Sequence, residues 1–156
     1  MEQPEKTDYL DKIMAYCARA ERCRQDVEKK LTAYGTPEDE MEPVIEILYQ
    51  ENFLDDERYT RFYTSDKWRL DQWGRLKIRN GLFRKGFSEA LIEKALDTID
   101  EEEYKAIMES VLSKKRKTLT AEEPVEQMKK LLAFGSNRGI EESLIWKWLE
   151  QEGLSF

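Results

Sequence analysis

The stretch GFSEALIEKAL, residues 86–96, contains the pattern that decides the fold. A glycine is followed after six residues by a bulky apolar residue, and after nine and ten residues by an apolar pair. The same pattern begins at Gly35 and at Gly139, so the three glycines lie 51 and 53 residues apart. A glycine that ends one helix, followed by an apolar stripe at i, i+3 and i+4, is typical of a helix–turn–helix pair. The sequence therefore predicts tandem helical modules, each too small to bury its apolar face alone.

Apolar spacing and capping residues divide the chain into three modules of three helices. The predicted helices cover residues 7–19, 24–34 and a segment from Pro37; 56–70, 74–85 and a segment capped by Ser88; and a segment from Asp100, 121–134 and 141–152. The predicted module boundaries are 1–54, 55–99 and 100–156. No strand pattern is present, so we expect an all-α fold in which three tandem three-helix repeats form an elongated, curved body.

Several local features are expected within these modules. Asp55 is the predicted N-cap of the helix that follows it, and Phe53 and Leu54 are expected to pack that helix against the preceding module. The helix at 74–85 is expected to bury Leu76, Leu82 and Phe83, with Ile78 as a further candidate. In the third module, the basic run 113–118 is expected to form a joint, and 135–139 an irregular loop.

The composition argues against most enzymatic and membrane functions. The chain has no histidine, no GxxxxGK[ST] loop and no GxGxxG loop, so His-dependent nucleophilic catalysis and phosphate cradling lack sequence support. Cys17 and Cys23 match no zinc or redox spacing and are expected to be reduced. No apolar run approaches the ~18–20 residues of a membrane span, and the polar, acidic N-terminus differs from a signal peptide. We expect a cytoplasmic, monomeric protein that is not an enzyme and has no cofactor or metal.

Charge is distributed unevenly along the chain. The net charge is −7, yet residues 36–57 carry nine acidic and no basic residues, whereas 58–86 carry nine basic residues and two acidic ones. Such asymmetry steers association, so the middle module is the expected contact for a polyanion or an acidic protein surface. The alternative is a solvated basic face that pairs with the acidic segment before it. The candidate contact residues are Lys67, Arg69, Arg75, Lys77, Arg79, Arg84, Lys85, Lys114, Lys115, Arg116 and Lys117.

Tryptophans near these cations admit two interpretations. Trp68 and Trp73 flank a predicted turn, where large aromatic residues either belong to the core or stack on bases or on a protein partner. Trp148 occupies a core position of the last helix, which leaves Trp146 as the candidate contact residue.

The stretch from Phe53 to Leu96 resembles the RecX family of bacterial recombination regulators. The matching residues are LDDERY at 54–59, Gly74-Arg75 with Ile78-Arg79, Arg84-Lys85-Gly86 and IEKAL at 92–96. Weaker matches upstream (Ala18-Arg19, Glu21, Arg24, Leu31) and downstream (Arg138-Gly139-Ile140, Ile145) extend the resemblance over nearly the whole chain. Gly135 departs from the pattern, because the equivalent positions of the first two modules are Leu31 and Leu82.

The resemblance implies a non-enzymatic modulator of RecA, active in homologous recombination, DNA repair and the SOS response. Members of this family bind the RecA–single-stranded DNA filament and restrain its ATPase, strand-exchange and coprotease activities. Two other interpretations stay open on the sequence alone: a helical module that binds DNA directly, and a protein–protein scaffold that makes no contact with nucleic acid.

Overall fold

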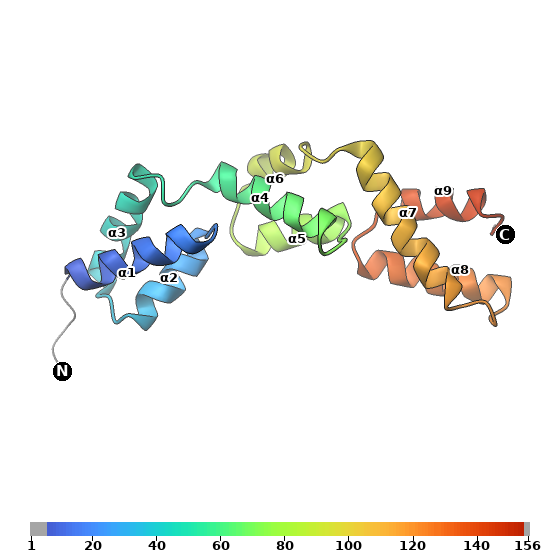
Figure 1. The fold of residues 1–156 in the computed structure, drawn as a ribbon, viewed down its shortest axis with the longest axis horizontal. Coiled ribbons are helices and arrows are strands. Elements are labelled where there is room, and N and C mark those ends of the chain that lie inside the picture. Colours follow the sequence, from blue (N-terminus) through green and yellow to red (C-terminus); the bar gives the residue numbers. More distant parts are fainter. Residues whose placement is uncertain (1–5, 155–156) are drawn as a thin grey trace.

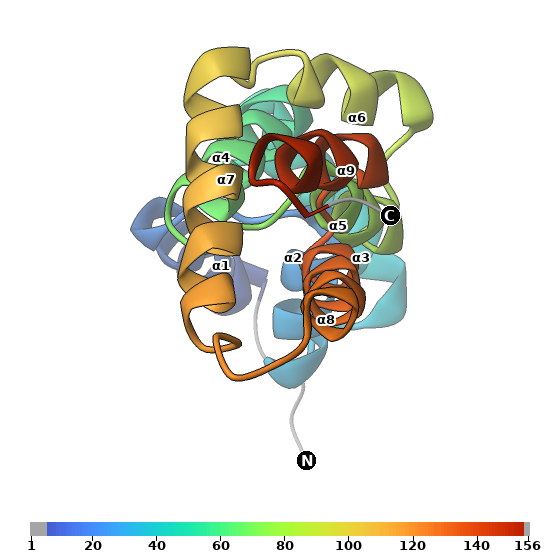
Figure 2. The ribbon, with the colours of Figure 1, turned by 90° about the vertical axis from the view of Figure 1, so that its right-hand side faces the viewer.

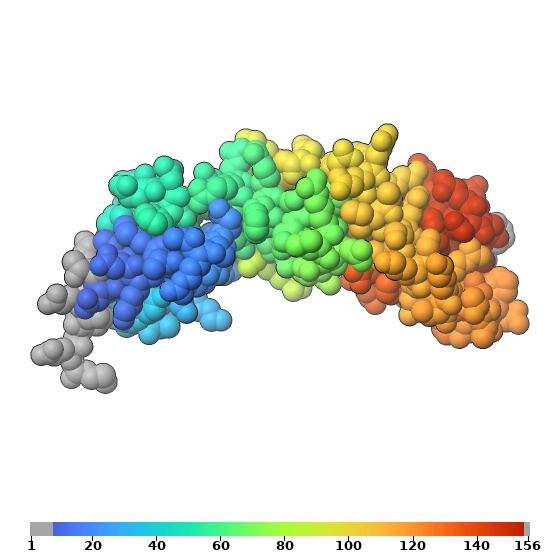
Figure 3. Space-filling model, in the orientation of Figure 1, coloured from blue at the N-terminus to red at the C-terminus, as the bar shows by residue number. Residues whose placement is uncertain are grey.

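The computed structural model describes residues 6–154, and every regular element in that range is a helix. The helices are α1 (Lys6–Arg19), α2 (Arg24–Ala33), α3 (Glu38–Gln50), α4 (Asp56–Arg69), α5 (Arg75–Arg84), α6 (Glu89–Leu96), α7 (Glu101–Lys117), α8 (Pro124–Asn137) and α9 (Glu142–Gln151). Residues 1–5 and 155–156, which belong to the predicted first and third modules, lie outside the described residues. The predicted fold class is confirmed: helices in groups of three follow one another along an arched, elongated body (Figure 1, Figure 3).

Short polar side chains fix where several helices begin. The predicted N-cap Asp55 accepts a hydrogen bond from the Arg58 N–H at 2.9 Å. Ser88 caps α6 and Asp100 caps α7 in the same way, each accepting from the N–H three residues later. Each such cap stabilises its helix by about 1 kcal/mol, so these helix starts are encoded locally.

The three repeated glycines end α2, α5 and α8 as the sequence predicts. Gly35, Gly86 and Gly139 have φ values of 77°, 88° and 82°, in the left-handed region that residues with a side chain disfavour. The residue after each glycine donates its N–H to the carbonyl five positions earlier, at 2.9–3.4 Å. This is the Schellman arrangement, which closes the helix and turns the chain towards the third helix of the module.

Buried apolar side chains form two cores rather than three. The first module has its own core, which includes Ile13, Leu31 and Leu48. The second and third modules share a continuous core, in which the Trp68 and Tyr104 rings meet edge-on at 6.3 Å. Cys23 is the residue of the first module that belongs to this shared core. The second and third modules are therefore packed as one unit.

The buried face of α5 differs from the prediction. Ile78 and Leu82 are fully buried, but Leu76 is 49% exposed and Phe83 is 70% exposed. Ile78 and Leu82 are four residues apart and lie on one side of the helix. Leu76 comes two residues before Ile78 and Phe83 one residue after Leu82, so both lie on other sides of the helix. The expectation that Leu76 and Phe83 are core residues is therefore wrong.

Two predicted irregular segments of the third module are helical. The basic run that was expected to form a joint is the last turn of α7, which ends at Lys117. Likewise α8 continues through Gly135 to Asn137, so the expected irregular loop is a tight turn. A Cβ on Gly135 would lie 2.5 Å from Cδ1 of Ile145, so glycine here lets α9 pack closely on α8. That packing compensates for the ~1 kcal/mol that an interior glycine costs a helix.

The joint between the second and third modules, the second joint, is made by backbone. The turn that follows α8 lies against the first residues of α5: Gly74 donates its N–H to the Arg138 carbonyl at 2.7 Å, and Leu76 donates to the Gly139 carbonyl at 3.0 Å. A Cβ on Gly74 would lie 2.2 Å from the Gly139 carbonyl atoms, and one on Gly139 would lie 2.3 Å from the Lys77 nitrogen. Both glycines are therefore needed for this close approach, in addition to the turn that Gly139 makes.

The joint between the first and second modules, the first joint, has the same layout with weaker contacts. The turn that follows α5 lies near the start of α2, where the Gln25 amide donates to the Arg84 carbonyl at 3.0 Å. Arg58 also pairs with Glu21 at 2.6 Å. The first joint thus relies on side chains at the place where the second joint has two backbone hydrogen bonds.

The described residues offer no membrane span and no metal cluster. None of the helices within residues 6–154 is long and apolar enough to cross a bilayer, and no group of three or more Cys, Asp or Glu side chains there is arranged to hold a metal ion. Cys17 and Cys23 are both free thiols and both buried. Burial raises the pKa of Cys17 to about 11, which keeps this thiol protonated and unreactive near neutral pH.

Substitution of Gly139 by alanine tests the glycine docking at the second joint. Gly153 is a matched control, because its φ is also positive (77°) and a Cβ there would meet no atom within 4 Å. We expect Gly153→Ala to lower the free energy of unfolding by about 1 kcal/mol through backbone strain alone. Gly139→Ala should cost at least about 2 kcal/mol more, because its Cβ collides with backbone. Urea unfolding followed by circular dichroism measures both; equal losses would contradict the docking role.

Candidate functional site

The candidate basic residues of the middle module centre on α5. This helix carries four basic residues, Arg75, Lys77, Arg79 and Arg84, and no acidic one. Figure 1 places α5 with α2 and α8, the second helix of each module, along the lower, concave side of the arch. The structure sorts the candidates into residues with internal carboxylate partners and residues without them.

Arg75 is part of the second joint. Its guanidinium pairs with Glu141 at 2.9 Å and also with Glu101, and it lies 4.1 Å from the centroid of the Tyr104 ring. The side chain is only 18% exposed. Burial lowers the pKa of Arg75, but the hydrogen bonds to Glu101 and Glu141 outweigh this and raise it above its ordinary value. Arg75 therefore fastens the third module to the second and is not free to meet a partner.

Three more candidates pair with carboxylates of their own or a neighbouring module. Arg79 pairs with Glu93, Arg69 with Glu103 at 3.6 Å, and Lys67 with Asp71 at 3.0 Å. These carboxylates lie outside residues 36–57, so the acidic segment before the middle module does not neutralise the basic candidates within the described residues. The two segments do meet at one ion pair within residues 6–154, between Arg61 and Glu57 at 3.4 Å, and Arg61 is not one of the candidate contact residues.

Lys77, Arg84 and Lys85 have no carboxylate within ion-pair distance in the described range 6–154. Lys77 instead lies 4.4 Å from the centroid of the Trp73 ring, and Lys85 lies 5.8 Å from that of Tyr63. An exposed cation–π contact contributes only about 0.5–1 kcal/mol and leaves the positive charge in place. These three cations are available to an anionic partner.

The tryptophans divide between core and surface. Trp68 is 1% exposed and belongs to the shared core, which excludes base stacking, and Trp148 is buried as predicted. Trp73 is half-buried, with Lys67 and Lys77 near its ring and Tyr63 at its edge. Trp146 is 37% exposed on α9. Of the two tryptophans beside the turn between α4 and α5, Trp73 alone lies where a partner can reach it.

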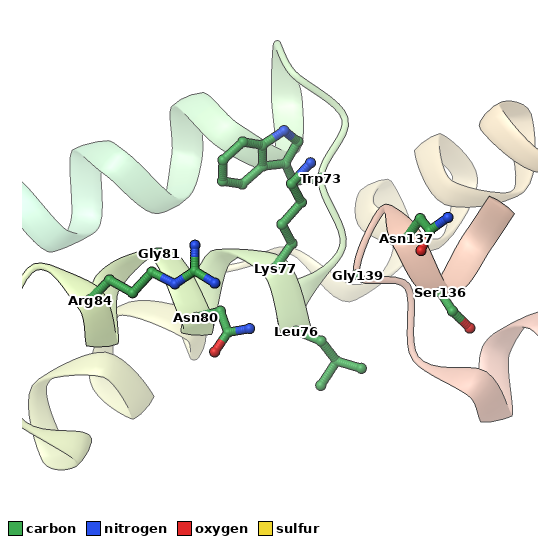
Figure 4. A pocket seen from close by; sticks show the side chains of 9 residues that line it. All are labelled: Trp73, Leu76, Lys77, Asn80, Gly81, Arg84, Ser136, Asn137 and Gly139. Atoms are coloured by element: carbon green, nitrogen blue, oxygen red, sulfur yellow. The ribbon is translucent and has the colours of Figure 1, made fainter. Parts of the chain in front are cut away.

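A groove of about 270 Å³ lies where α5 meets the turn after α8, and we call it the inter-module groove. Both of the charged side chains that line it, Lys77 and Arg84, are basic. Figure 4 shows Lys77 rising towards the Trp73 ring, while Ser136 and Asn137 lie across from it at the end of α8. Its lining residues are Trp73, Leu76, Lys77, Asn80, Gly81, Arg84, Ser136, Asn137 and Gly139.

The chemistry of the inter-module groove suits an anion. Two cations, two side-chain amides and a hydroxyl supply donors, and no carboxylate lines the groove to repel a negative group. Carboxylates and phosphates both match such a set of donors. The N-terminus of α5 contributes nothing to the site, because its first N–H groups already donate to Arg138, Tyr104 and Gly139.

The basic residues at the end of α7 form a separate region. Arg116 pairs with Glu152 at 3.0 Å, and Lys115 lies 5.4 Å from the centroid of the Phe134 ring. Lys114 and Lys117 have no carboxylate partner among residues 6–154. The two ribbon views place this turn beside the start of α8 and away from α5 (Figure 1, Figure 2). The eleven candidates therefore do not form one continuous surface.

The polar residues of the groove, Asn80, Ser136 and Asn137, were not predicted. Neutral side chains carry no charge signal in a sequence, and Asn80 comes from the second module whereas Ser136 and Asn137 come from the third. The one available signal was the departure of the third glycine turn, GSNRG at 135–139, from the composition of its two counterparts.

Comparison with known proteins identifies the group to which the chain belongs. The family model for the second three-helix domain of RecX matches residues 55–96. A regulatory protein RecX from Chlorobaculum tepidum is 30% identical over 141 residues, which cover 90% of this chain and 86% of that protein. The chain belongs to the RecX family. A regulatory protein RecX from Clostridium botulinum is 32% identical over 137 residues, and there the match spans 86% of this chain but 63% of the relative.

Solved RecX structures have the same fold. The crystal structure of a regulatory protein RecX superposes with a TM-score of 0.81 at 23% identity, covering 88% of this chain and 68% of the other. RecX from Lactobacillus salivarius gives a TM-score of 0.83 at 18% identity, with 96% and 97% covered. The RecX relatives are named regulatory proteins, not enzymes, which agrees with the expectation of a non-catalytic function.

Charge reversal separates the joint residue from the groove residues. We expect Arg75→Glu to lower the free energy of unfolding by at least about 2 kcal/mol, because it leaves Glu101 and Glu141 beside a third carboxylate. The double variant Lys77→Glu/Arg84→Glu should stay within about 0.5 kcal/mol of the unaltered chain per position, since neither side chain has an internal carboxylate partner. Urea unfolding measures both. A stable Arg75→Glu variant would contradict the assignment of Arg75 to the joint.

Proposed function

We propose that this chain regulates RecA by binding the RecA–single-stranded DNA filament through the inter-module groove, and that binding lowers the ATPase, strand-exchange and coprotease activities of the filament. Membership of the RecX family supports a regulatory function. The observation that carries the proposal is the pair Lys77 and Arg84, which have no carboxylate partner among residues 6–154 and line a groove of a chain whose net charge is −7. Because the rest of the chain is acidic, it repels most anions, and an anionic partner is attracted only where it fits this basic groove.

The shape of the molecule favours a partner that is itself extended. α2, α5 and α8 lie along the concave side of the arch, so a filament lying there would meet all three modules (Figure 1). Weak contacts spread along a body add up when the geometry allows them to engage together. Binding along the filament would act by steric and electrostatic exclusion of a second DNA strand or of further RecA protomers.

The proposal takes the chain to be a cytoplasmic monomer without cofactor, with modules at 1–54, 55–99 and 100–156. Of the candidate residues, it assigns the primary contact to Lys77, Arg84 and Lys85. Trp73 lines the groove, Lys67 lies beside its ring, and Lys114 and Lys117 supply a second, separate contact.

The DNA-dependent ATPase of RecA from the same organism tests the proposal. With RecA on long single-stranded DNA, we expect the unaltered chain to lower the rate at sub-stoichiometric ratios. Lys77→Glu/Arg84→Glu should require at least tenfold more protein for the same effect, because two attractive charges become repulsive.

A matched control is Lys94→Glu/Lys105→Glu on α6 and α7, which changes the net charge by the same amount at exposed lysines on helices other than the three of the concave side. We expect this variant to inhibit within twofold of the unaltered chain. An unchanged ATPase at molar excess of the unaltered chain would overturn RecA regulation. Equal loss in both charge variants would instead refute the groove as the contact.

Salt-sensitive binding to naked single-stranded DNA without any effect on RecA would favour a direct DNA-binding module.

A further inference from the structure

Two large apolar side chains stand on the outer surface of α5, although the core of the module is complete without them. Leu76 and Phe83 are 49% and 70% exposed, whereas Ile78 and Leu82 fill the inward positions. The two exposed residues are seven apart, two turns of helix, which places them in one row about 10 Å long. Single exposed apolar residues are ordinary, but a row of them beside a binding groove is a specific arrangement.

A row of cations runs beside the apolar row. Each residue advances the direction of the side chain by about 100°, so Phe83, Leu76, Asn80, Arg84 and Lys77 follow one another in this order over an arc of about 120°. The arc is apolar along one edge and cationic along the other, with an amide between them. We call these five residues the α5 ridge. Figure 4 shows Lys77 pointing up from the helix and Leu76 pointing down, with Arg84 and Asn80 further along the helix at heights between them.

The ridge stands between two hollows of different character. On the cationic side lies the inter-module groove, which Leu76 and Asn80 also line. On the apolar side a hollow of about 270 Å³ is lined by Arg79, Asn80, Phe83, Glu89 and Ile92. There Arg79 is neutralised by Glu93, and Glu89 adds a negative charge. A negatively charged occupant is therefore attracted to one side of the ridge only.

The apolar row and the cationic row of the ridge together are complementary to an acidic amphipathic helix. Helix-in-groove recognition places apolar side chains of the partner on an apolar row, and flanking charges set its orientation. Nucleic acid is the poorer match, because Phe83 is the one aromatic side chain of the ridge and lies on its far edge from Lys77, in the hollow where Glu89 repels phosphate. We propose that the α5 ridge binds an acidic amphipathic segment of a protein partner, with apolar side chains against Leu76 and Phe83 and carboxylates against Lys77 and Arg84. Combined with the proposed function, on which this last step rests, the ridge contacts the protein of the filament and not its DNA.

A labelled peptide tests the ridge independently of RecA. The probe is an 18-residue helix-forming peptide with leucines along one face and glutamates along one flank, and its binding is followed by fluorescence anisotropy at moderate salt. We expect it to bind the full chain at least tenfold more tightly than a scrambled peptide of the same composition, or a peptide with lysine in place of glutamate. Failure to prefer the acidic amphipathic peptide would overturn the inference.

Two pairs of variants show where the peptide binds. Leu76→Ser/Phe83→Ser should weaken peptide binding at least tenfold. Phe62→Ser/Val125→Ser removes apolar side chains that are similarly exposed (56% and 45%) on other helices, and should change it less than twofold. Because all four side chains are exposed, we expect both variants to keep the melting temperature of the unaltered chain within a few degrees. Equal effects of the two pairs would refute the ridge as the site.

The same variants separate the ridge from the proposed function. A fluorescent oligothymidylate should bind the unaltered chain and Leu76→Ser/Phe83→Ser within twofold of each other, whereas the latter should lose at least tenfold in inhibition of the RecA ATPase. Loss of oligonucleotide binding with unchanged peptide binding would mark α5 as a nucleic-acid surface and overturn the inference. Loss of peptide binding with full RecA inhibition would overturn the ridge as the RecA contact and leave the proposed function intact. Peptide binding by a chain that does not affect RecA would refute the proposed function alone.

Discussion

The architecture depends on the approach of two backbone segments at the second joint. Gly74 and Leu76 at the start of α5 donate to carbonyls of the turn that ends α8. The first N–H groups of a helix need acceptors, and here another module supplies them. The contact is possible only because Gly74 and Gly139 have no Cβ. Arg75, which follows Gly74, adds ion pairs to Glu101 and Glu141. The inter-module groove exists because this joint holds the end of α8 beside α5.

Features that depend on neighbouring residues could be predicted from the sequence. Asp55 and Ser88 cap helices, and Gly35, Gly86 and Gly139 end them, because each acts through its own side chain or its own φ. The buried face of α5 could not be predicted in the same way. Leu76, Ile78, Leu82 and Phe83 allow more than one inward face at helical spacing, and the packing of α4 and α6 decides between them.

Prediction of the site was limited by contacts between distant segments. The charge count singled out α5, but it could not distinguish Arg75, which is held by Glu101 and Glu141, from Lys77, which has no such partner among residues 6–154. These pairs join residues 26 and 66 positions apart in the chain. The basic end of α7 was predicted to be a joint because four consecutive cations resemble a solvated linker. In the structure these cations form the last turn of the helix, where they interact favourably with the negative end of its dipole.

The two joints differ in how they resist bending. The second joint has two backbone hydrogen bonds and a core continuous across both modules, whereas the first joint has the Gln25 side-chain bond, the Arg58–Glu21 pair and Cys23. Side-chain contacts can adjust by rotation at little cost in free energy. Two backbone hydrogen bonds beside a continuous core cannot adjust without being broken. We therefore expect the molecule to bend mainly at the first joint, about a third of the way along the chain. If the surface that this chain binds changes its curvature, we expect the first module to re-orient while the last two modules move as one body.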